Sequence, residues 1–324
     1  MTDDVVAGGR GAGEGPGRVL VMGAGGFVGR RLTAAFREAG WEVVAATRAG
    51  GADGPALDVT DADAVRRRVA EVRPRVVVNL AAIAHRKLEG SAADVYEAVN
   101  HRGVRHLLDA SLAAGVERFV HFSSASVYGE EGRSGALRED AERRPVGPYA
   151  ESKARAEDAC AGVDPARMPV VVLRPPAIWA PGWVRDVRKR AYVPGTGVLL
   201  EITGRPPHHS LCALEHVVGF ARMAAEGVAP GVYNVADDPP YAQPEIAAAI
   251  GALEGTRRRV RVPAAAAGLP LAVARLVPGG AGRVIRSHAW KLLRGLVLDT
   301  ARARAAGFVP RYRLDDLLRD GDVA

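Results

Sequence analysis

A tyrosine and a lysine stand four residues apart in the segment Tyr149-Ala150-Glu151-Ser152-Lys153. If this segment begins a helix, the two side chains lie on one face, because residues i and i+4 are neighbours on a helix surface. An ammonium group beside a phenol favours the phenolate, and so lowers the tyrosine pKa from its ordinary value of about 10. Such a tyrosine can donate or accept a proton at a carbonyl or hydroxyl oxygen.

A serine-rich segment, Ser123-Ser124-Ala125-Ser126, precedes this pair. A serine hydroxyl across a pocket can hold the same substrate oxygen that the tyrosine protonates. A tyrosine and a lysine at this spacing also occur in ordinary helices, so the pair by itself is weak evidence for chemistry. The elements that must position these residues therefore decide the prediction.

The first such element is a glycine-rich turn. The apolar run 18–22 is followed by Gly23-Ala-Gly-Gly-Phe-Val-Gly29 and then by a helical pattern that ends at Gly40. Strand, glycine turn and helix in this order permit a ligand to approach the backbone closely, and the helix N-terminus offers N–H groups to a pyrophosphate. The pattern predicts a dinucleotide site that includes Gly23, Gly26, Phe27, Val28 and Gly29.

The end of the second predicted strand, residues 42–47, indicates which dinucleotide binds. In dinucleotide-binding folds an acid at this point holds the ribose 2′-hydroxyl. Here the strand ends in Thr47-Arg48, without a carboxylate. A guanidinium suits a 2′-phosphate, so NADP(H) is favoured and NAD(H) remains the alternative. Arg30 and Arg31 can approach the same place, and the less favoured alternative is that Arg48 is a solvated loop residue.

Further residues follow the next strands. Asp58 stands where an adenine amino group can be held or where a turn needs an acid, and Asp61 can cap the helix that runs to Val72. The apolar strand 75–82 carries Asn79 near its carboxyl end, where ligands of parallel sheets bind. Asn100 lies within a predicted helix over 92–114. The remaining predicted cofactor contacts are Thr47, Arg48, Asp58, Val59, Leu80, Ala81, Ala82, Asn100, Tyr149, Lys153 and Pro175.

Strands and helices alternate to residue 173, with further strands over 117–122 and 170–173. This spacing predicts an α/β fold with a doubly wound, Rossmann-like parallel sheet. We expect a disordered leader over 1–17, a dinucleotide-binding domain over 18–176 that carries the catalytic residues, and a smaller C-terminal substrate-binding cap over 177–324. Some segments of the cap are expected to return to the sheet.

Composition narrows the class of protein. The 324 residues carry a formal net charge of +7, and the excess arginine is scattered along the chain. Nucleic-acid binders usually concentrate positive charge beside exposed aromatic residues, so the balance favours a small anionic substrate. The two cysteines, Cys160 and Cys212, offer neither a disulfide framework nor a metal site. No run of about 18 apolar residues predicts a membrane span, and we expect a cytoplasmic protein.

These motifs occur in one order: the glycine turn, Asn79-Leu-Ala-Ala82, Asn100, Ser124 with Val127-Tyr-Gly129, the Tyr149/Lys153 pair, and Arg174-Pro-Pro176. In this order the chain resembles the extended short-chain dehydrogenase/reductase family, of the nucleotide-sugar epimerase/dehydratase type, over residues 18–320. The resemblance implies that Tyr149 is the acid/base, that Lys153 lowers its pKa and holds the nicotinamide ribose, and that Ser124 polarises the substrate carbonyl. The predicted substrate contacts are His85, Ser124, Ser126, Trp179 and His209.

The sequence departs from that family at two places. The 4,6-dehydratases carry an Asp-Glu pair after the active hydroxyl residue, whereas this chain has Ala125-Ser126, which disfavours water elimination. Many members place an arginine where His208 or His209 stands. Arg188, Lys189, Arg190, Arg205, Arg283 or Arg286 can take over its contact with a diphosphate.

Four functions follow from this comparison. The leading one is an NADPH-dependent ketoreductase that acts on a nucleotide-activated keto-sugar. The alternatives are a nucleotide-sugar 4-epimerase with tightly bound NAD, a reductase of a non-nucleotide natural-product ketone, and a dinucleotide-sensing protein without turnover. The family resemblance also implies a homodimer through the helices 92–114 and 149–161, where Ala150, Ala154 and Ala161 allow close approach.

Overall fold

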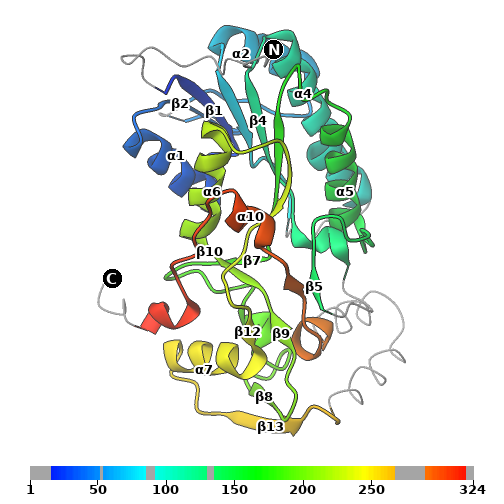
Figure 1. Cartoon of the computed structure of the whole chain (residues 1–324), viewed down its shortest axis with the longest axis vertical. Coiled ribbons are helices and arrows are strands. Elements are labelled where there is room, and N and C mark those ends of the chain that lie inside the picture. Colours follow the sequence, from blue (N-terminus) through cyan, green and yellow to red (C-terminus); the bar gives the residue numbers. More distant parts are fainter. Residues whose placement is uncertain (1–15, 52–53, 85–91, 130–134, 267–288, 319–324) are drawn as a thin grey trace, which may run out of the picture.

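The structure is a computed structural model and describes residues 16–51, 54–84, 92–129, 135–266 and 289–318. The predicted leader therefore lies almost wholly outside the described residues, as does His85. Figure 1 shows a large sheet covered by helices in the upper half and smaller strand pairs below it.

Six parallel strands form the main sheet, in the spatial order β11-β6-β4-β3-β1-β2. Their bounds are β1 Arg18–Met22, β2 Glu42–Ala46, β3 Val76–Asn79, β4 Arg118–Phe122, β6 Val170–Arg174 and β11 Gly231–Asn234. Valine dominates these strands because β-branched side chains pack well on a pleated surface that is buried on both faces. The predicted doubly wound α/β sheet is confirmed.

Alternate residues of each strand point to opposite faces, and each face has its own helices. Val19 and Val21 of β1 pack with α1 (Phe27–Glu38) and α6 (Leu214–Glu226). Leu20 and Met22 pack with α2 (Ala62–Val72), α4 (Gly103–Ala113) and α5 (Pro148–Ala161). Figure 1 shows the two helix layers on either side of the sheet.

Local signals explain where several helices begin and end. Asp61 caps α2, as predicted, since its carboxylate accepts a hydrogen bond from the Ala64 N–H at 2.9 Å. The predicted helix over 92–114 is present as α3 (Ala92–Tyr96), a π-helical turn (Glu97–Arg102) and α4. α5 begins with Pro148 in its first turn, where the missing N–H of proline costs no hydrogen bond.

The lower part of the molecule, seen in Figure 1, has its own apolar core around Trp179, Leu199, Tyr241 and Ile246. Paired strands surround this core, and the pairs are β7 (Ala177–Trp179) with β10 (Leu211–Ala213), β8 (Leu199–Thr203) with β13 (Arg259–Pro263), and β9 (His208–His209) with β12 (Tyr241–Ala242). Helix α7 (Gln243–Leu253) covers them. Outside this group, β14 (Val297–Leu298) pairs with β5 (Ala136–Leu137).

Two elements from beyond residue 176 belong to the main sheet and its layers. β11 pairs with β6 along the sheet edge, with Tyr233 opposite Leu173. Helix α6 packs against α1 through the same apolar cluster. The main sheet and one of its helix layers are therefore completed by residues that come late in the chain.

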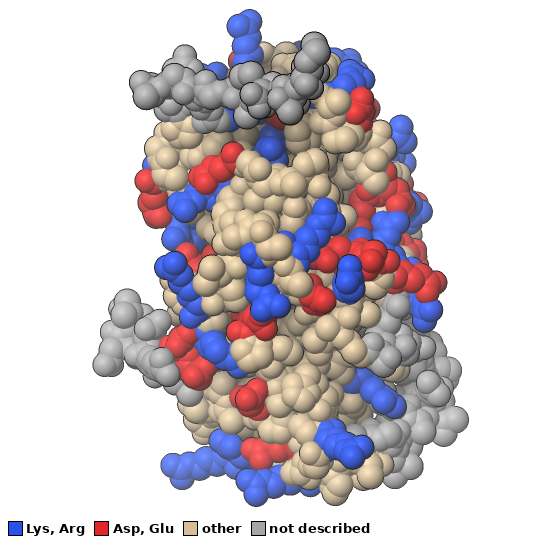
Figure 2. Space-filling model, in the orientation of Figure 1, with Lys and Arg blue, Asp and Glu red and all other residues tan. Residues whose placement is uncertain are grey.

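Charged side chains of both signs are interspersed on the face shown in Figure 2. That face lacks the single-sign stripe typical of nucleic-acid binders. In the described part of the chain, no helix is long and apolar enough to span a bilayer.

Candidate active site

The glycine turn between β1 and α1 is packed too tightly for a side chain at Gly23 and at Gly29. Gly23 has φ +78°, and a Cβ there would lie 2.8 Å from the Ala81 nitrogen. A Cβ on Gly29 would lie 2.3 Å from the Gly23 carbonyl oxygen. Helix α1 begins without a side-chain cap, so its first N–H groups and positive dipole end are available to an anion. These features fit the pyrophosphate of a dinucleotide.

Polar side chains gather at the carboxyl ends of β3 and β4. Asn79 accepts a hydrogen bond from the Ala81 N–H at 3.0 Å, which fixes the start of the loop after β3. Its amide nitrogen lies 3.3 Å from Nδ1 of His121, a fully buried residue of β4. Burial first, and then the Lys153 charge, hold the pKa of His121 well below its ordinary value. His121 is therefore neutral and structural.

The predicted catalytic residues Ser124, Tyr149 and Lys153 meet beside this cluster. Tyr149 is hydrogen-bonded to the side chain of Ser124. Its ring packs edge to face on Tyr96, with 6.1 Å between the ring centroids. Lys153, one turn further along α5, donates from Nζ to the carbonyl oxygen of Phe122 at 2.7 Å. The arrangement places a phenol, a hydroxyl and an ammonium along one cavity.

The ionisation of this group differs from the sequence-based expectation. Burial raises the pKa of Tyr149, the hydrogen bond from Ser124 lowers it in part, and the charge of Asp186 adds to the rise. The Lys153 ammonium is directed to the Phe122 carbonyl oxygen, and the burial of Tyr149 is the largest influence on the tyrosine pKa. Burial lowers the pKa of Lys153 to about 8.

One cavity of about 680 Å³ joins the glycine turn to the catalytic residues. It is large enough for a drug-sized ligand. Most of the predicted site residues line it: Gly23, Gly26, Phe27, Val28, Gly29, Leu80, Ala82, Ser124, Ser126, Tyr149, Lys153, Pro175 and His209.

Other predicted contacts are not among the residues that line this cavity. Trp179 is buried in the lower core and donates from Nε1 to Asp237 at 2.6 Å. Val59 packs under the sheet, and Thr47 hydrogen-bonds the Gly50 carbonyl oxygen. Asp58 accepts two bonds from Thr60, as a turn acid does. Ala81 and the exposed Arg48 also lie outside the lining.

Asn100 is buried in the π-helical turn and supports the site from behind. Its side chain exchanges two hydrogen bonds with the backbone of Ile83, at 2.8 and 3.0 Å, and donates to Ser152 at 3.1 Å. It thereby ties the loop after β3 to helix α5. Such π-helical turns are frequent at functional sites because they turn a side chain out of the regular helical register.

The structure adds residues that sequence reasoning did not assign to the site. The cavity is also lined by Tyr96, Trp183, Asp186, Trp290, Lys291 and Arg294. Trp183 stacks on Phe27, with ring centroids 4.4 Å apart, and so joins the segment after β7 to the glycine turn. Asp186 forms an ion pair with Lys189. Apart from Tyr96, which lies in the predicted helix over 92–114, these residues come from segments whose sequence has no clear periodic pattern.

Two of the alanines expected at a dimer interface are instead buried by other residues of the same chain. Ala150 and Ala154 are 3% and 8% exposed, and Ala154 packs with Tyr128 and Leu137. Ala161 is exposed. The outward face of α5 carries Glu151, Arg155 and Asp158 instead, so a homodimer through this helix stays a prediction.

Asp186→Asn is expected to lower the pKa of Tyr149, because the carboxylate opposes formation of the phenolate. The alkaline limb of the pH profile of kcat should then move to lower pH. Asp140→Asn, at an exposed position outside the cavity lining, is the matched control. An alkaline limb that stays in place in Asp186→Asn contradicts the electrostatic link.

Comparison with known proteins agrees with this geometry. The model of the NAD dependent epimerase/dehydratase family matches residues 19–236. A dTDP-4-dehydrorhamnose reductase from Streptomyces griseus is 41% identical over 132 residues, which is 40% of this chain and 40% of that protein. A 3-diazoavenalumate denitrifying reductase from Streptomyces sp is 32% identical over 245 residues, which is 69% of this chain and 77% of that protein.

Among solved structures, the complex of a Thermus thermophilus UDP-glucose 4-epimerase with NAD superposes with a TM-score of 0.69 at 23% identity, covering 93% of this chain and 96% of that one. This likeness shows the fold. The chain spans less than two thirds of the length of the Streptomyces griseus reductase.

Proposed function

Because the chain belongs to the NAD dependent epimerase/dehydratase family, we propose that it is an NADPH-dependent ketoreductase whose substrate is a nucleotide-activated keto-sugar. The family makes it an NAD(P)-dependent enzyme of the oxidoreductase/epimerase group. The observation that carries the finer proposal is Arg48, which is exposed two residues after the end of β2, where an NAD-specific fold places a carboxylate. A reductase consumes its cofactor at each turnover, and a 2′-phosphate is typical of the reducing dinucleotide pool.

The residues of the glycine turn would hold the dinucleotide. The N–H groups at the start of α1 would face the pyrophosphate, and Leu80, Ala82 and Pro175 would line its path to the catalytic residues. The nicotinamide supplies the hydride when it is bound. The close contacts at Gly23 and Gly29 support this fit, because they hold the turn as tightly as a dinucleotide-binding turn requires.

The chain's own residues would then supply the proton to the substrate. Ser124 would hold the substrate carbonyl oxygen by a hydrogen bond, and Tyr149 would donate its phenolic proton to the same oxygen. A raised pKa keeps Tyr149 protonated and ready to donate at neutral pH. Lys153 would stabilise the phenolate that forms, because its ammonium lies on the same face of α5.

The lining of the cavity supports an anionic, ring-containing substrate. Lys189, Arg190, Lys291 and Arg294 bring basic side chains to the cap side of the cavity, with Trp290 among them. Such groups suit a diphosphate and a base or sugar ring. His209 does not replace the missing family arginine, because burial and the charge of Arg190 hold its pKa well below the ordinary value.

A nucleotide-sugar 4-epimerase with tightly bound NAD is the second candidate, and the NAD complexes among the superposing structures favour it. The named relatives that are reductases favour the first. A reductase of a non-nucleotide natural-product ketone fits the apolar wall that Phe27 and Trp183 form. A non-catalytic dinucleotide sensor would not need Ser124, Tyr149 and Lys153 together.

One experiment separates these functions. The purified protein is incubated with NADPH and a nucleoside-diphosphate 4-keto-hexose, and loss of NADPH absorbance is followed together with the sugar product. Oxidation of NADPH that matches alcohol formation supports the reductase. Protein that is purified with bound NAD⁺ and interconverts two nucleotide hexoses without added cofactor refutes it in favour of the epimerase.

Arg48→Ala tests the cofactor preference. The wild type is expected to bind NADPH on the order of tenfold more tightly than NADH, since charge-assisted hydrogen bonds at an exposed site are screened. The pKa of Asp58 is lowered first by two hydrogen bonds from Thr60 and further by the charge of Arg48, so this carboxylate lies near the guanidinium. Its negative charge repels a 2′-phosphate and limits the preference for NADPH. Dissociation constants for both cofactors should show that Arg48→Ala weakens NADPH binding alone.

Arg30 and Arg31 offer little compensation in that variant. Arg31 makes a bidentate ion pair with Glu215, at 2.8 and 2.9 Å, and Arg30 donates to the Gly25 carbonyl oxygen at 2.7 Å. Arg167→Ala, at an exposed position outside the cavity lining, serves as the control for lost charge. Equal weakening of NADH and NADPH by Arg48→Ala would refute the assignment.

A further inference from the structure

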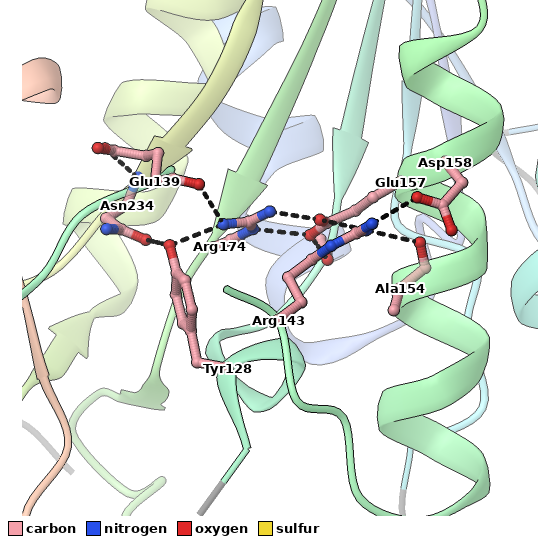
Figure 3. A network of polar contacts seen from close by, with 9 residues as sticks. Tyr128, Glu139, Arg143, Ala154, Glu157, Asp158, Arg174 and Asn234 are labelled. Atoms are coloured by element: carbon pink, nitrogen blue, oxygen red, sulfur yellow. Dashed lines mark hydrogen bonds and ion pairs between the residues drawn. The ribbon is translucent and has the colours of Figure 1, made fainter. Parts of the chain in front are cut away.

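A network of buried charges lies directly behind the catalytic residues, and the proposed reaction does not use it. Figure 3 shows its centre, where Arg174 at the end of β6 meets Glu157 of α5. Arg174 is 4% exposed and Glu157 is also 4% exposed. Burying two charges is costly unless their geometry is good and their remaining hydrogen-bonding groups are satisfied.

The geometry of this pair is bidentate. Arg174 donates from Nε to one carboxylate oxygen of Glu157 at 2.9 Å and from Nη2 to the other at 2.6 Å. Its Nη1 donates to the Tyr128 hydroxyl at 2.8 Å and to the Glu139 carbonyl oxygen at 2.9 Å. Arg143 adds a bond to Glu157 at 3.2 Å and one to the Ala154 carbonyl oxygen at 2.9 Å.

Glu157 is the point where this network reaches the catalytic segment. The Ser123 hydroxyl donates to the same Glu157 oxygen that accepts from Arg174 Nε. Ser123 is the residue before Ser124, and its own N–H donates to the Leu173 carbonyl oxygen of β6 at 2.8 Å. The backbone of Ser124 is thus held from one side by a side chain of α5, the helix that carries Tyr149 and Lys153.

Glu157 also follows Lys153 by one helical turn on the same face. The charged and titratable groups around Lys153 are Glu157, Cys160 and Tyr149 of α5, His121 of β4, and Arg174 of β6 behind the glutamate. Burial outweighs them and lowers the pKa of Lys153, and the negative charge of Glu157 is the main influence that raises it.

We propose that Glu157 is a positioning residue of the active site, which fixes the Ser123–Ser124 segment against α5 and acts on Lys153 through its charge. The part that concerns turnover rests on the proposed function. The part that concerns Lys153 rests on the geometry of α5 alone. Glu157 therefore has two effects besides its packing in the core. It fixes the position of the Ser124 hydroxyl through Ser123, and it favours the charged form of the Lys153 ammonium.

The charge effect is tested by NMR, without any substrate. The chain has four lysines, so ¹³C-lysine labelling gives few signals, and Lys153→Arg identifies the one from Lys153. The signal should titrate near pH 8 in the wild type. Glu157→Gln should move the midpoint to lower pH, whereas Glu157→Asp, which keeps the charge, should return it toward the wild-type value. An unchanged midpoint in Glu157→Gln overturns the proposal.

Glu157→Gln leaves Arg174 without its carboxylate, so its fold is checked by circular dichroism. If that variant does not fold, Glu157→Gln combined with Arg174→Gln removes both buried charges, and the same lowered midpoint is expected. A midpoint at the wild-type pH in the double variant overturns the charge effect as well.

The positioning effect is tested with Ser123→Ala, which removes one hydrogen bond and no charge. Its kcat should fall about tenfold, because small displacements of a reacting group are costly, while the Lys153 midpoint and the cofactor dissociation constant stay unchanged. Ser111→Ala removes the hydroxyl of another buried serine, on α4, and is the control. A wild-type kcat in Ser123→Ala overturns the positioning role. If the wild type reduces no keto-sugar, the proposed function fails and the NMR result still decides the charge effect.

Discussion

Tyr149→Phe should lose roughly 10²- to 10⁴-fold of turnover while its dinucleotide affinity stays close to that of the wild type. The hydroxyl that is removed is the one bonded to Ser124, and a phenyl ring has no proton to donate. The ring itself should remain in place, because its edge-to-face contact with Tyr96 and its position on α5 do not depend on the hydroxyl. The loss should therefore appear in kcat rather than in cofactor binding.

The matched control is Tyr233→Phe, which removes a phenolic hydroxyl that donates to the Ala229 carbonyl oxygen and lies outside the cavity lining. Steady-state kinetics and cofactor titrations on both variants make the comparison. If Tyr149→Phe turns over as fast as Tyr233→Phe, Tyr149 is not the proton donor, and the catalytic assignment is wrong.

Gly29→Ala should weaken cofactor binding by at least about tenfold and lower the free energy of unfolding by about 1–3 kcal/mol. The added methyl group would lie 2.3 Å from the Gly23 carbonyl oxygen and 2.8 Å from the Ala24 Cα. Both contacts are with backbone, so no side-chain rotation relieves them. The turn has to open, and the N–H groups at the start of α1 then lose their alignment with the pyrophosphate.

Gly219→Ala is the corresponding change in α6, where the new methyl group meets nothing within 4 Å. That variant should gain about 0.5–1 kcal/mol, since alanine restricts the unfolded chain and favours a helix interior. Isothermal titration with NADPH and thermal unfolding measure both variants. Gly29→Ala that binds and unfolds like Gly219→Ala would show that the turn does not need its glycine.

The sequence predicted those parts of the fold that follow from local patterns. Valine-rich runs, the glycine turn and the Asp61 cap are signals within a few residues, and each appears in the structure where it was expected. Trp179 and Trp183 show the limit of such signals. They stand four residues apart in a stretch rich in Pro and Gly, yet Trp179 is buried against Asp237 and Trp183 lines the cavity.

The catalytic trio was predicted because its spacing is set by one helix and one strand end. The basic lining from Lys291 and Arg294 was not, since these residues reach the cavity from the other end of the chain and no pattern links them to it. The ionisation of Tyr149 also could not be predicted from the sequence. Proximity to a lysine predicted a lowered pKa for Tyr149, and desolvation of the phenol raises this pKa instead.

Completion of the main sheet has to wait until the ribosome has released β11. All three catalytic residues are synthesised earlier, and β6 has an unpaired edge until Gly231–Asn234 arrives beside it. Asn234 then accepts a hydrogen bond from the Tyr128 hydroxyl at 2.7 Å, which closes the charge network around Arg174. The catalytic side chains are thus synthesised before the strand that completes the sheet and the charge network behind them. A nascent chain therefore contains all three catalytic residues before the fold can hold them in position.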